Sequence, residues 1–369
     1  MDKSKIGILT FHNALSYGAK LQAYALQQFL RELGVANDII DYQCEHMYKR
    51  HIRPIRVDPT ERVKSFLRSL LTMGQVKKER VASEEFIRAH MQLSRRFDKR
   101  DIAQAADEYR AFIAGSDQVW SPTVVGFDKV YFLDFARPEQ KYSYAASIGG
   151  SPLDESTRRE YTRLLSDYQM LSVREPQAAQ LVEELTGRTP AVCVDPTLLF
   201  DREKWNQITV SCAQVPKGEP YIFLFNVNPP KELFAYALEL SKKTKLPVYS
   251  IQKNRRQRID GIHYLDPVTA NEFLGLIRDA AYVVTNSFHA TVFSVIYHKE
   301  FAVELSTRGT RNTRSEALLQ NLGIEGREIL NAQTPASIPE ADWKAADDRL
   351  RQMRQASVDY LIKLKEALS

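Results

Sequence analysis

Hydrophobic and polar positions fall into alternating blocks, which predict strands and helices that follow one another along the chain. The clearest stretch is Ala281–Glu304. Its first residues, Tyr282–Thr285, are β-branched or aromatic without interruption, which predicts a strand buried on both faces. Apolar residues recur at helical spacing from Ala290, and Phe301–Leu305 returns to a strand pattern. The stretch therefore predicts one strand, turn, helix and strand unit whose polar residues are confined to the turn.

The same alternation recurs in both halves of the chain. Strands are predicted at residues 5–11, 38–42, 111–114, 131–135, 141–147, 170–173, 192–194, 221–225, 247–251 and 261–264. Helices are predicted at residues 21–33, 154–169, 231–242, 270–278, 315–322 and 341–368. Strands that alternate with helices are typical of α/β proteins with parallel sheets.

The length of 369 residues fits two domains of ordinary size. Periodicity fades over Thr197–Lys217 and ends in a Pro/Gly turn, which is typical of a domain boundary. We therefore place an N-terminal domain at 1–205, with a helical excursion at 45–100, and a C-terminal domain at 218–340. The last segment, 341–369, is expected to be a helix that packs on the first domain.

Composition and charge narrow the functional classes. Hydrophobic residues make up 44% and charged residues 26% of the chain, which is a globular composition. The net charge of +5 is mild and the basic runs lack interleaved aromatic residues, so we expect no nucleic acid partner. The runs Lys49–Arg56 and Lys253–Arg258 are typical of solvated loops but would also suit anionic substrates or a membrane surface. Peripheral contact with the inner membrane therefore stays open.

Location and metal content follow from what the sequence lacks. It has no apolar run long enough to cross a bilayer and no recognisable cleavage site near the N-terminus, so we expect a cytoplasmic protein. If it contacts the membrane, it does so at the cytoplasmic face. Cys44, Cys193 and Cys212 are widely spaced, so neither a disulfide framework nor a CxxC metal site is indicated.

Polar side chains gather where the predicted strand 282–285 ends. The turn contains an amide, a hydroxyl and an imidazole, in Asn286, Ser287 and His289. At the start of a helix, backbone N–H groups and the helix dipole favour an anion, so this turn suits a phosphate-bearing ligand. The alternative is that Ser287 merely caps the helix and His289 makes a structural hydrogen bond.

Three strand ends in the first half also carry polar residues. The loop after the first strand lacks a GxGxxG pattern, so a dinucleotide is not indicated. The turn Gly115–Gln118 offers donors and acceptors, or is an ordinary Asx or Ser turn. Arg174 directly follows a buried strand. Such an arginine usually pairs with a carboxylate, but it can also hold a phosphate or carboxylate ligand.

Several of these segments coincide with the motifs of one family. The blocks are GILTFHNALSYGAKLQAYALQ, FIAGSDQVWSP, VYFLDF, KYSYAASIG, LSVREPQA, VDPTLL and VVTNSFHATVFSVIYHKEF. These blocks occur in the order of the family's motifs, and the chain resembles the polysaccharide pyruvyl transferase family over nearly its whole length. The resemblance implies a GT-B-like fold, with two Rossmann-type domains facing across a cleft and the C-terminal helix crossing back to the first domain.

The resemblance also implies an activity. The enzyme would move a pyruvyl group from phosphoenolpyruvate to a pair of sugar hydroxyls and form a ketal. The acceptor would be a glycan or lipid-linked saccharide, on the route to a bacterial surface polysaccharide or cell-wall polymer. Phosphoenolpyruvate would be the donor substrate, with no cofactor and no metal, because arginines can serve as the phosphate clamp.

Roles follow for the candidate residues. We expect His289 and Arg174 to be catalytic, His289 as the acid/base group and Arg174 as a fixed cation. The expected donor-binding residues are Asn286, Ser287, Phe288, Thr291, Arg308 and Arg311. The expected acceptor or cleft residues are His12, Asn13, Tyr17, Gly18, Gly115, Ser116, Asp117 and Gln118.

The motif departs from the family pattern in two places. Family members carry Arg-Leu-His where this chain has Ser287, Phe288 and His289, and Ala290 replaces a common glycine. The arginine must therefore come from elsewhere in the chain or be absent. Two other functions stay open: a GT-B glycosyltransferase that uses a nucleotide sugar, with Asp266 as the residue for its ribose, and a non-catalytic binding subunit. The sequence does not specify the acceptor sugar, the ketal linkage and stereochemistry, or the oligomeric state.

Overall fold

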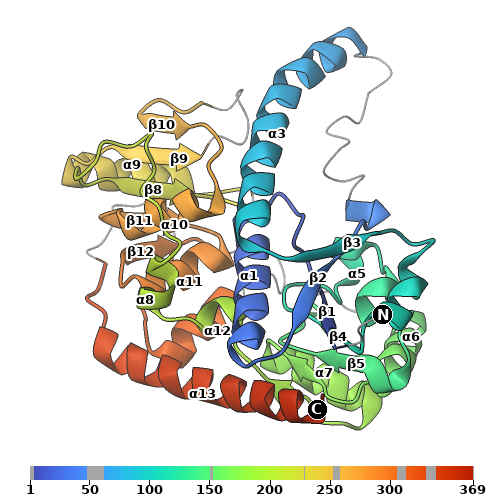
Figure 1. Cartoon of the computed structure of the whole chain (residues 1–369). Coiled ribbons are helices and arrows are strands. Elements are labelled where there is room, and N and C mark those ends of the chain that lie inside the picture. The colour runs from blue at the N-terminus through green and yellow to red at the C-terminus, as the bar shows by residue number, and fades with distance from the viewer. Residues whose placement is uncertain are drawn as a thin grey trace. The chain divides into compact units, whose positions relative to one another are not determined.

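The structure is a computed structural model that describes residues 4–47, 62–149, 153–227, 229–251, 258–305, 313–329 and 338–368. The chain divides into two compact units. Unit 1 contains Met1–Ile52, Ile87–Leu199 and Arg351–Ser369, and unit 2 contains Arg53–Phe86 and Phe200–Leu350 (Figure 1). Each unit has its own parallel sheet and helices, so the predicted α/β fold class is confirmed.

Unit 1 is built on a five-stranded parallel sheet of order β3-β2-β1-β4-β5. Its strands are β1 (Ile6–Leu9), β2 (Asn37–Tyr42), β3 (Leu93–Phe97), β4 (Ala111–Ala114), β5 (Lys141–Ser143), β6 (Ser172–Val173) and β7 (Ala191–Val192). Its helices include α1 (Tyr17–Glu32), α4 (Ala105–Glu108), α5 (Pro122–Val125), α6 (Glu155–Ser166) and α7 (Pro176–Thr186), with 3₁₀ turns η2 (Ile102–Gln104), η3 (Lys129–Phe132), η4 (Pro138–Gln140) and η5 (Pro196–Leu198). Strands β6 and β7 pair in parallel and extend the sheet through bridges at Tyr142–Met170 and Ala146–Val173.

Unit 2 repeats this plan with the strand order β10-β9-β8-β11-β12, again all parallel. The strands are β8 (Ile222–Phe225), β9 (Val248–Ile251), β10 (Ile262–Leu265), β11 (Tyr282–Thr285) and β12 (Glu300–Val303). The helices are α8 (Arg202–Asn206), α9 (Leu233–Thr244), α10 (Ala270–Arg278), α11 (Phe288–Ile296) and α12 (Thr313–Leu322), with parts of α3 (Arg62–His90) and α13 (Trp343–Ala367). In each sheet the strand order reverses beside the first strand, where open α/β sheets place their ligands.

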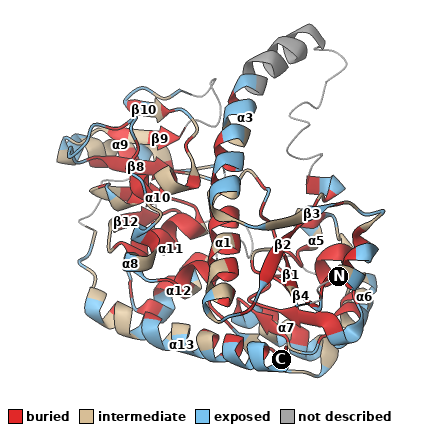
Figure 2. Ribbon diagram, in the orientation of Figure 1, coloured by how far each residue is buried: buried red, intermediate tan, exposed pale blue. Residues whose placement is uncertain are grey.

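The burial of the strands explains why these sequences form parallel sheets. All residues of β1, β2, β4 and β8 are buried, and in Figure 2 these strands are red. Strands β1, β4 and β8 are continuously apolar, and such strands are stable only when helices cover both faces of the sheet. The edge strand β3 is different, because its pattern is intermediate and exposed up to Phe97.

Two local predictions are wrong. The aromatic segment Tyr131–Phe135 was expected to be a strand, but Tyr131 and Phe132 lie in the 3₁₀ turn η3, where both side chains are buried in the core. The excursion at 45–100 was expected to be helical, but it contains the strand β3, which pairs with β2. The first prediction was wrong because the apolar residues of Tyr131–Phe135 resemble a strand pattern. The second was wrong because β3 is an exposed edge strand that carries Arg95 and Arg96.

The unit limits also differ from the expected domain limits. Arg53–Phe86, expected in the first domain, groups with unit 2, where the Lys78 ammonium pairs with the Asp266 carboxylate at 2.9 Å. The second segment of unit 1 ends at Leu199 rather than near 205. The first difference arises because α3 is one uninterrupted helix that belongs to unit 2 in its first part and to unit 1 in its last residues.

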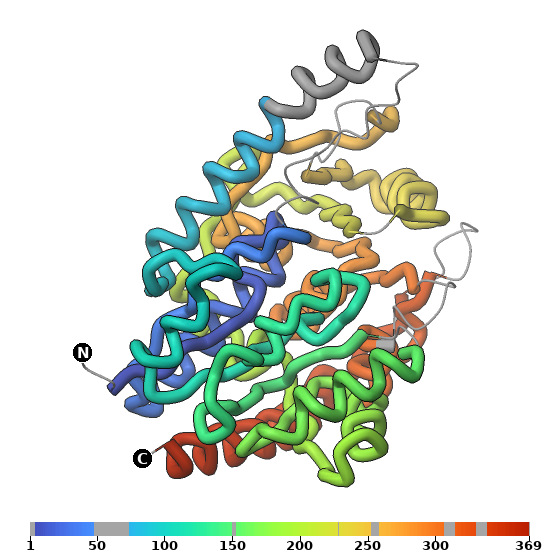
Figure 3. The backbone as a smooth tube through the Cα atoms, turned by 90° about the vertical axis from the view of Figure 1, so that its right-hand side faces the viewer, coloured from blue at the N-terminus to red at the C-terminus, as the bar shows by residue number. Residues whose placement is uncertain are grey.

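Helix α13, at the red end of the chain in Figure 3, is also continuous, and its residues are divided between the two units. Its start belongs to unit 2, where the Trp343 ring stacks on His298 with centroids 4.7 Å apart and Asp347 accepts a hydrogen bond from His298 Nε2 at 2.9 Å. Its end belongs to unit 1, where Ser357 Oγ accepts from Val194 N at 2.9 Å. The last part of this helix therefore groups with unit 1, whereas its first two turns group with unit 2. Within the described residues, no helix combines the length and apolar character needed to cross a membrane.

Candidate functional site

In unit 2, the turn that connects β11 to α11 is held by several hydrogen bonds. Ser287 is the N-cap of α11, and its Oγ accepts from Ala290 N at 3.4 Å. The Thr291 hydroxyl donates to Ser287 O at 3.0 Å, and Thr285 Oγ1 accepts from Ser287 N at 3.0 Å. Ser287 therefore caps the helix, as the alternative interpretation of the sequence held. These bonds fix the backbone that carries His289.

His289 lies in the first turn of α11 and is 8% exposed. Its ring packs against the Phe288 ring with centroids 5.1 Å apart and an interplanar angle of 73°. The guanidinium of Arg314 lies over the same Phe288 ring at 5.2 Å, close enough for a cation–π contact. An imidazole, an aromatic ring and a cation thus adjoin one another at the carboxyl end of β11.

Arg314 was not chosen as a donor-binding residue from the sequence, although it closes the run that contains Arg308 and Arg311. The latter two arginines lie outside the described residues. The spacing of the run gave no reason to prefer one arginine. The contact with Phe288 depends on the position of α12, which the local sequence does not reveal.

A second group of bonds connects the turn to neighbouring elements. Asn286 Oδ1 accepts from Val227 N at 2.9 Å, and Asn286 Nδ2 donates to Glu304 Oε2 at 3.4 Å. The other carboxylate oxygen, Glu304 Oε1, accepts from the backbone N–H groups at the start of α9, which are Lys231 at 3.0 Å, Glu232 at 2.5 Å and Leu233 at 2.9 Å. Glu304, which the sequence did not single out, therefore caps α9 from a different strand.

In unit 1, Arg174 is the centre of a buried polar network. Its Nη1 donates to Asp195 Oδ2 at 2.6 Å and its Nε donates to Glu175 Oε1 at 3.0 Å. Ser116 Oγ lies 3.4 Å from both Arg174 Nη1 and Asp195 Oδ2. The structure thus brings together Ser116 and Arg174, two predicted site residues, with two carboxylates that were not predicted.

Electrostatics favour the charged form of Arg174. Burial by itself would lower its pKa, but the nearby carboxylates of Glu175 and Asp195 outweigh burial and raise the pKa above its ordinary value. Asp195 is held in turn by Thr197, whose hydroxyl and backbone N–H both donate to Oδ1, at 2.7 and 3.1 Å. Because two carboxylates already match its charge, Arg174 offers little net positive charge to a donor phosphate. Its catalytic role stays a prediction, and the geometry favours a structural one.

The loop after β1 forms a separate cluster. His12 is 1% exposed, with Nδ1 3.3 Å from Thr10 O and Nε2 3.2 Å from Asp41 Oδ1. Arg96 Nε also donates to Asp41, at 3.1 Å. Burial alone would raise the pKa of Asp41, but the contacts with His12 and Arg96 lower it below the ordinary value. The contacts with His12 and Arg96 therefore favour the ionised form of Asp41.

The remaining predicted residues of unit 1 are placed mainly by backbone geometry. Asn13 Nδ2 donates to Tyr42 O at 3.4 Å, and Tyr17 and Gly18 form the first turn of α1. Asp117 has a φ of 72°, and its Oδ1 accepts from Gln118 N at 2.9 Å. This bond goes to the adjacent residue and not to the N–H group two residues on, so it does not form an Asx turn.

Packing explains why position 115 is a glycine. A Cβ atom at this position would lie 3.0 Å from Thr10 Cβ. Thr10 Oγ1 donates to Ser116 O at 2.8 Å, so the ends of β1 and β4 are held close together. Glycine permits this close approach at the point where the strand order reverses.

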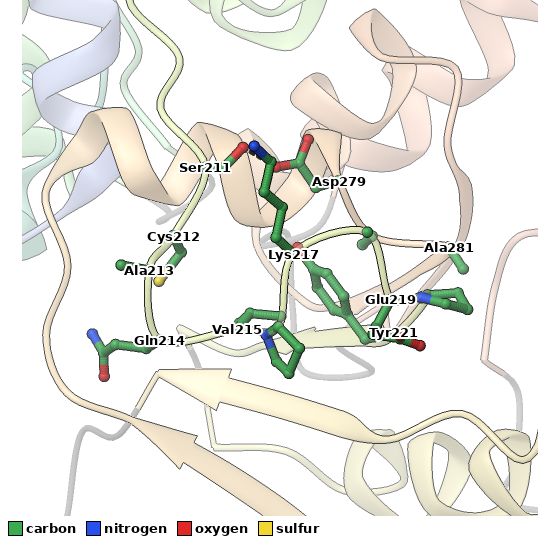
Figure 4. Close-up of a pocket in the computed structure, with 14 residues that line it drawn as sticks. Ser211, Cys212, Ala213, Gln214, Val215, Lys217, Glu219, Tyr221, Asp279 and Ala281 are labelled. Carbon is green, nitrogen blue, oxygen red and sulfur yellow. Dashed lines mark hydrogen bonds between the residues drawn. The ribbon is translucent and has the colours of Figure 1, made fainter.

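One pocket of unit 2 lies elsewhere. It has a volume of about 1020 Å³ and is lined by residues 211–221 and 279–281 (Figure 4). Tyr221 precedes β8 and Ala281 precedes β11, so the pocket lies at the amino ends of these parallel strands, opposite the edge that carries His289. None of the predicted site residues lines it. Among the described residues, no cluster of His, Cys, Asp and Glu could hold a metal ion.

The two doubly wound sheets, each with polar residues at its carboxyl edge, define a GT-B-like protein. The UDP-GlcNAc 2-epimerase from Neisseria meningitidis, solved bound to UDP-GlcNAc, shares this fold with a TM-score of 0.51 and 10% identity over 98% of this chain and 99% of that chain. Matches also include the UDP-GlcNAc 2-epimerase from Methanocaldococcus jannaschii, with a TM-score of 0.47 and 12% identity over 95% of this chain and 99% of that chain. The glycosyltransferase SnogD from Streptomyces nogalater matches with a TM-score of 0.43 and 10% identity over 99% of this chain and 100% of that chain.

Sequence comparison identifies the family within this fold. The model of the polysaccharide pyruvyl transferase family matches residues 17–303. The chain therefore belongs to the polysaccharide pyruvyl transferase family, which confirms the resemblance stated above. No curated protein matches the chain significantly.

Proposed function

We propose that this protein transfers a pyruvyl group from phosphoenolpyruvate to two hydroxyls of a sugar and so forms a ketal. The acceptor is a glycan or lipid-linked saccharide that serves as precursor of a surface polysaccharide or cell-wall polymer. The observation that carries the proposal is the family match over residues 17–303, which includes the whole turn Asn286–His289. The geometry of that turn supports it, because a titratable group and a cation adjoin the start of a buried helix.

The reaction forms two new C–O bonds at the enol carbon, the first by addition and the second by displacement of phosphate. A proton reaches the methylene carbon of phosphoenolpyruvate, which becomes a methyl group, and one sugar hydroxyl adds to the enol carbon and loses its proton. The second hydroxyl then displaces phosphate, and its proton leaves with the phosphate. The products are one ketal and one inorganic phosphate. In this proposal His289 delivers the proton to the methylene carbon.

The leaving phosphate needs positive charge and hydrogen-bond donors. We propose that Arg314 supplies the charge, because its guanidinium packs on the Phe288 ring, which in turn packs against the His289 ring. Cations aimed at a charge that develops during the reaction are commonly the largest contribution of a site to rate. Arg308 and Arg311 stay as further donor-binding expectations outside the described residues.

The nucleotide-sugar alternative has less support at its expected residue. Asp266 follows β10, pairs with Lys78 at 2.9 Å and is about half exposed, with 52% of its side chain accessible. Its backbone N donates to Gln214 Oε1 at 2.8 Å. An exposed surface ion pair is not the buried acidic residue that ribose recognition would require.

The test is phosphate release from phosphoenolpyruvate in the presence of a panel of free and lipid-linked saccharides, with the ketal product identified by mass. We expect release that depends on one acceptor. The variant His289→Gln should fold normally and lose at least ~10²-fold in turnover, because glutamine keeps a hydrogen bond but cannot carry the proton. His263→Gln is the matched control, since His263 is exposed on β10 of the same unit. Normal turnover in His289→Gln with a lowered melting temperature would instead assign the histidine a purely structural role.

A further inference from the structure

Glu304 lies where three segments of unit 2 meet, and it is 7% exposed. It directly follows β12, and its backbone N donates to Thr285 O at 2.8 Å, so it lies beside the last residue of β11. Its Oε1 accepts from three consecutive backbone N–H groups at the start of α9, and its Oε2 accepts from Asn286 Nδ2. One carboxylate thus joins the loop after β8 to the turn that carries His289.

The cap of α9 explains why this position requires a carboxylate. The N-cap residue of α9, Glu232, makes no side-chain hydrogen bond to the helix end, so the first N–H groups would lack a local acceptor. Glu304 supplies the acceptor from another strand, and its negative charge is favourable at the positive end of the helix dipole. The same carboxylate fixes the Asn286 amide in one orientation, with Nδ2 toward Glu304 and Oδ1 toward Val227 N.

We propose that Glu304 is a positioning residue of the active site, which acts through Asn286 on the turn that holds His289. This inference rests on the proposed function for its catalytic consequence, whereas the coupling itself can be measured without substrate. Glu304 has no proton-transfer role in this proposal. It sets the position of the imidazole that has one.

Exchanging the hydrogen-bond donor and acceptor between Asn286 and Glu304 tests whether this pair positions His289. In Glu304→Gln the amide oxygen can still accept from the N–H groups of α9, but the new Nε2 faces Asn286 Nδ2, so two donors oppose each other. In the double variant Glu304→Gln/Asn286→Asp, an aspartate oxygen replaces Nδ2 and accepts from the glutamine. The other aspartate oxygen still accepts from Val227 N. The double variant therefore restores the pair with donor and acceptor exchanged.

The first measurement is the imidazole resonance of His289 in protein with labelled histidine, assigned by its loss in His289→Gln. We expect Glu304→Gln to shift this resonance and the double variant to move it back toward the wild-type position. Glu272→Gln is the matched control, because Glu272 accepts from Thr269 N at 2.9 Å and caps α10 at the same edge of the same sheet. It should lower the melting temperature without shifting the His289 resonance.

The second measurement is phosphate release, once an acceptor is known, together with calorimetric binding of phosphoenolpyruvate. Glu304→Gln should lower kcat about fivefold or more, the equivalent of one lost hydrogen bond, with a smaller effect on donor affinity. A His289 resonance unchanged by Glu304→Gln would overturn the proposal, as would a shift that the double variant fails to reverse. If the resonance behaves as expected but the wild type does not bind phosphoenolpyruvate, the positioning role stands and the proposed donor is wrong.

Discussion

Replacing Arg174 by methionine should strongly destabilise unit 1. Arg174 is 8% exposed and its guanidinium bonds Asp195 at 2.6 Å and Glu175 at 3.0 Å. Methionine fills much of the same volume but leaves two carboxylates at 9% exposure or less without their cation. Breaking a buried ion pair from one side costs about 3–5 kcal/mol, because a charge stays buried without compensation. For a unit of this size each kcal/mol corresponds to roughly 2–4 °C, so we expect a loss of roughly 6–20 °C in Tm.

The assay is thermal unfolding followed by circular dichroism, with Arg163→Met as the matched control. Arg163 also contacts two carboxylates, Asp134 at 3.3 Å and Glu160 at 3.4 Å, but its side chain is 52% exposed. Exposed pairs contribute about 0–1 kcal/mol, so this variant should change Tm little. Neutralising the whole cluster with Arg174→Met, Glu175→Gln and Asp195→Asn should recover most of the loss, because no unmatched charge then remains buried.

The result also separates a structural from a catalytic Arg174. If its role is structural, folded Arg174→Met protein measured at low temperature keeps its affinity for phosphoenolpyruvate. A Tm within about 2 °C of the wild type would refute the reasoning on the buried charges. A normal Tm with lost donor affinity would instead restore the catalytic role that the sequence predicted.

Three further outcomes follow from particular contacts. Arg314→Ala should weaken phosphoenolpyruvate binding about 10-fold or more in calorimetry, since a charged contact contributes about 1.5–3 kcal/mol, and equal affinity would remove Arg314 from the site. His12 is among the contacts that lower the pKa of Asp41, so this carboxylate stabilises the fold above the ordinary aspartate pKa and less as pH falls through its lowered value. Asp41→Asn should therefore flatten the acid limb of a Tm-against-pH curve, and an unchanged limb would contradict this. Gly275→Ala would place a Cβ 2.0 Å from Val210 O, so soluble yield and Tm should both fall, and a wild-type Tm would show that the backbone can move aside.

The sequence predicted the sheet strands well where burial is uniform. Ala111–Ala114 and Tyr282–Thr285 have the same limits in the structure as in the sequence pattern, because a strand buried on both faces must be continuously apolar. The prediction failed where apolar residues do not form a strand, and where a strand is not apolar. Phe132 is fully buried in a 3₁₀ turn, and β3 carries arginines because one side of an edge strand faces solvent.

The site could be predicted as a set of turns but not as a set of contacts. Strand ends located Ser116 and Arg174 in unit 1 and His289 in unit 2, since the carboxyl ends of the parallel strands of each sheet share one edge. The partners were missed because they are distant in sequence. An arginine at a buried strand end implies a carboxylate, but only the fold selects Asp195. Glu304 gave one usable signal, a carboxylate after a buried strand with no adjacent cation.

The two units differ in how they use the turn after the fourth strand of their common order. In unit 1 the turn after β4 contains Asp117 and meets Arg174, whose positive charge is already compensated by Glu175 and Asp195, so this edge offers hydroxyl, amide and carboxylate groups. In unit 2 the turn after β11 carries a histidine and adjoins the cation of Arg314 through Phe288. A polar edge without uncompensated positive charge suits sugar hydroxyls, whereas a cationic and titratable edge suits a phosphate-bearing donor. We therefore expect unit 2 to bind phosphoenolpyruvate and unit 1 to bind the acceptor, so that substitutions in the two turns should affect the apparent KM of different substrates.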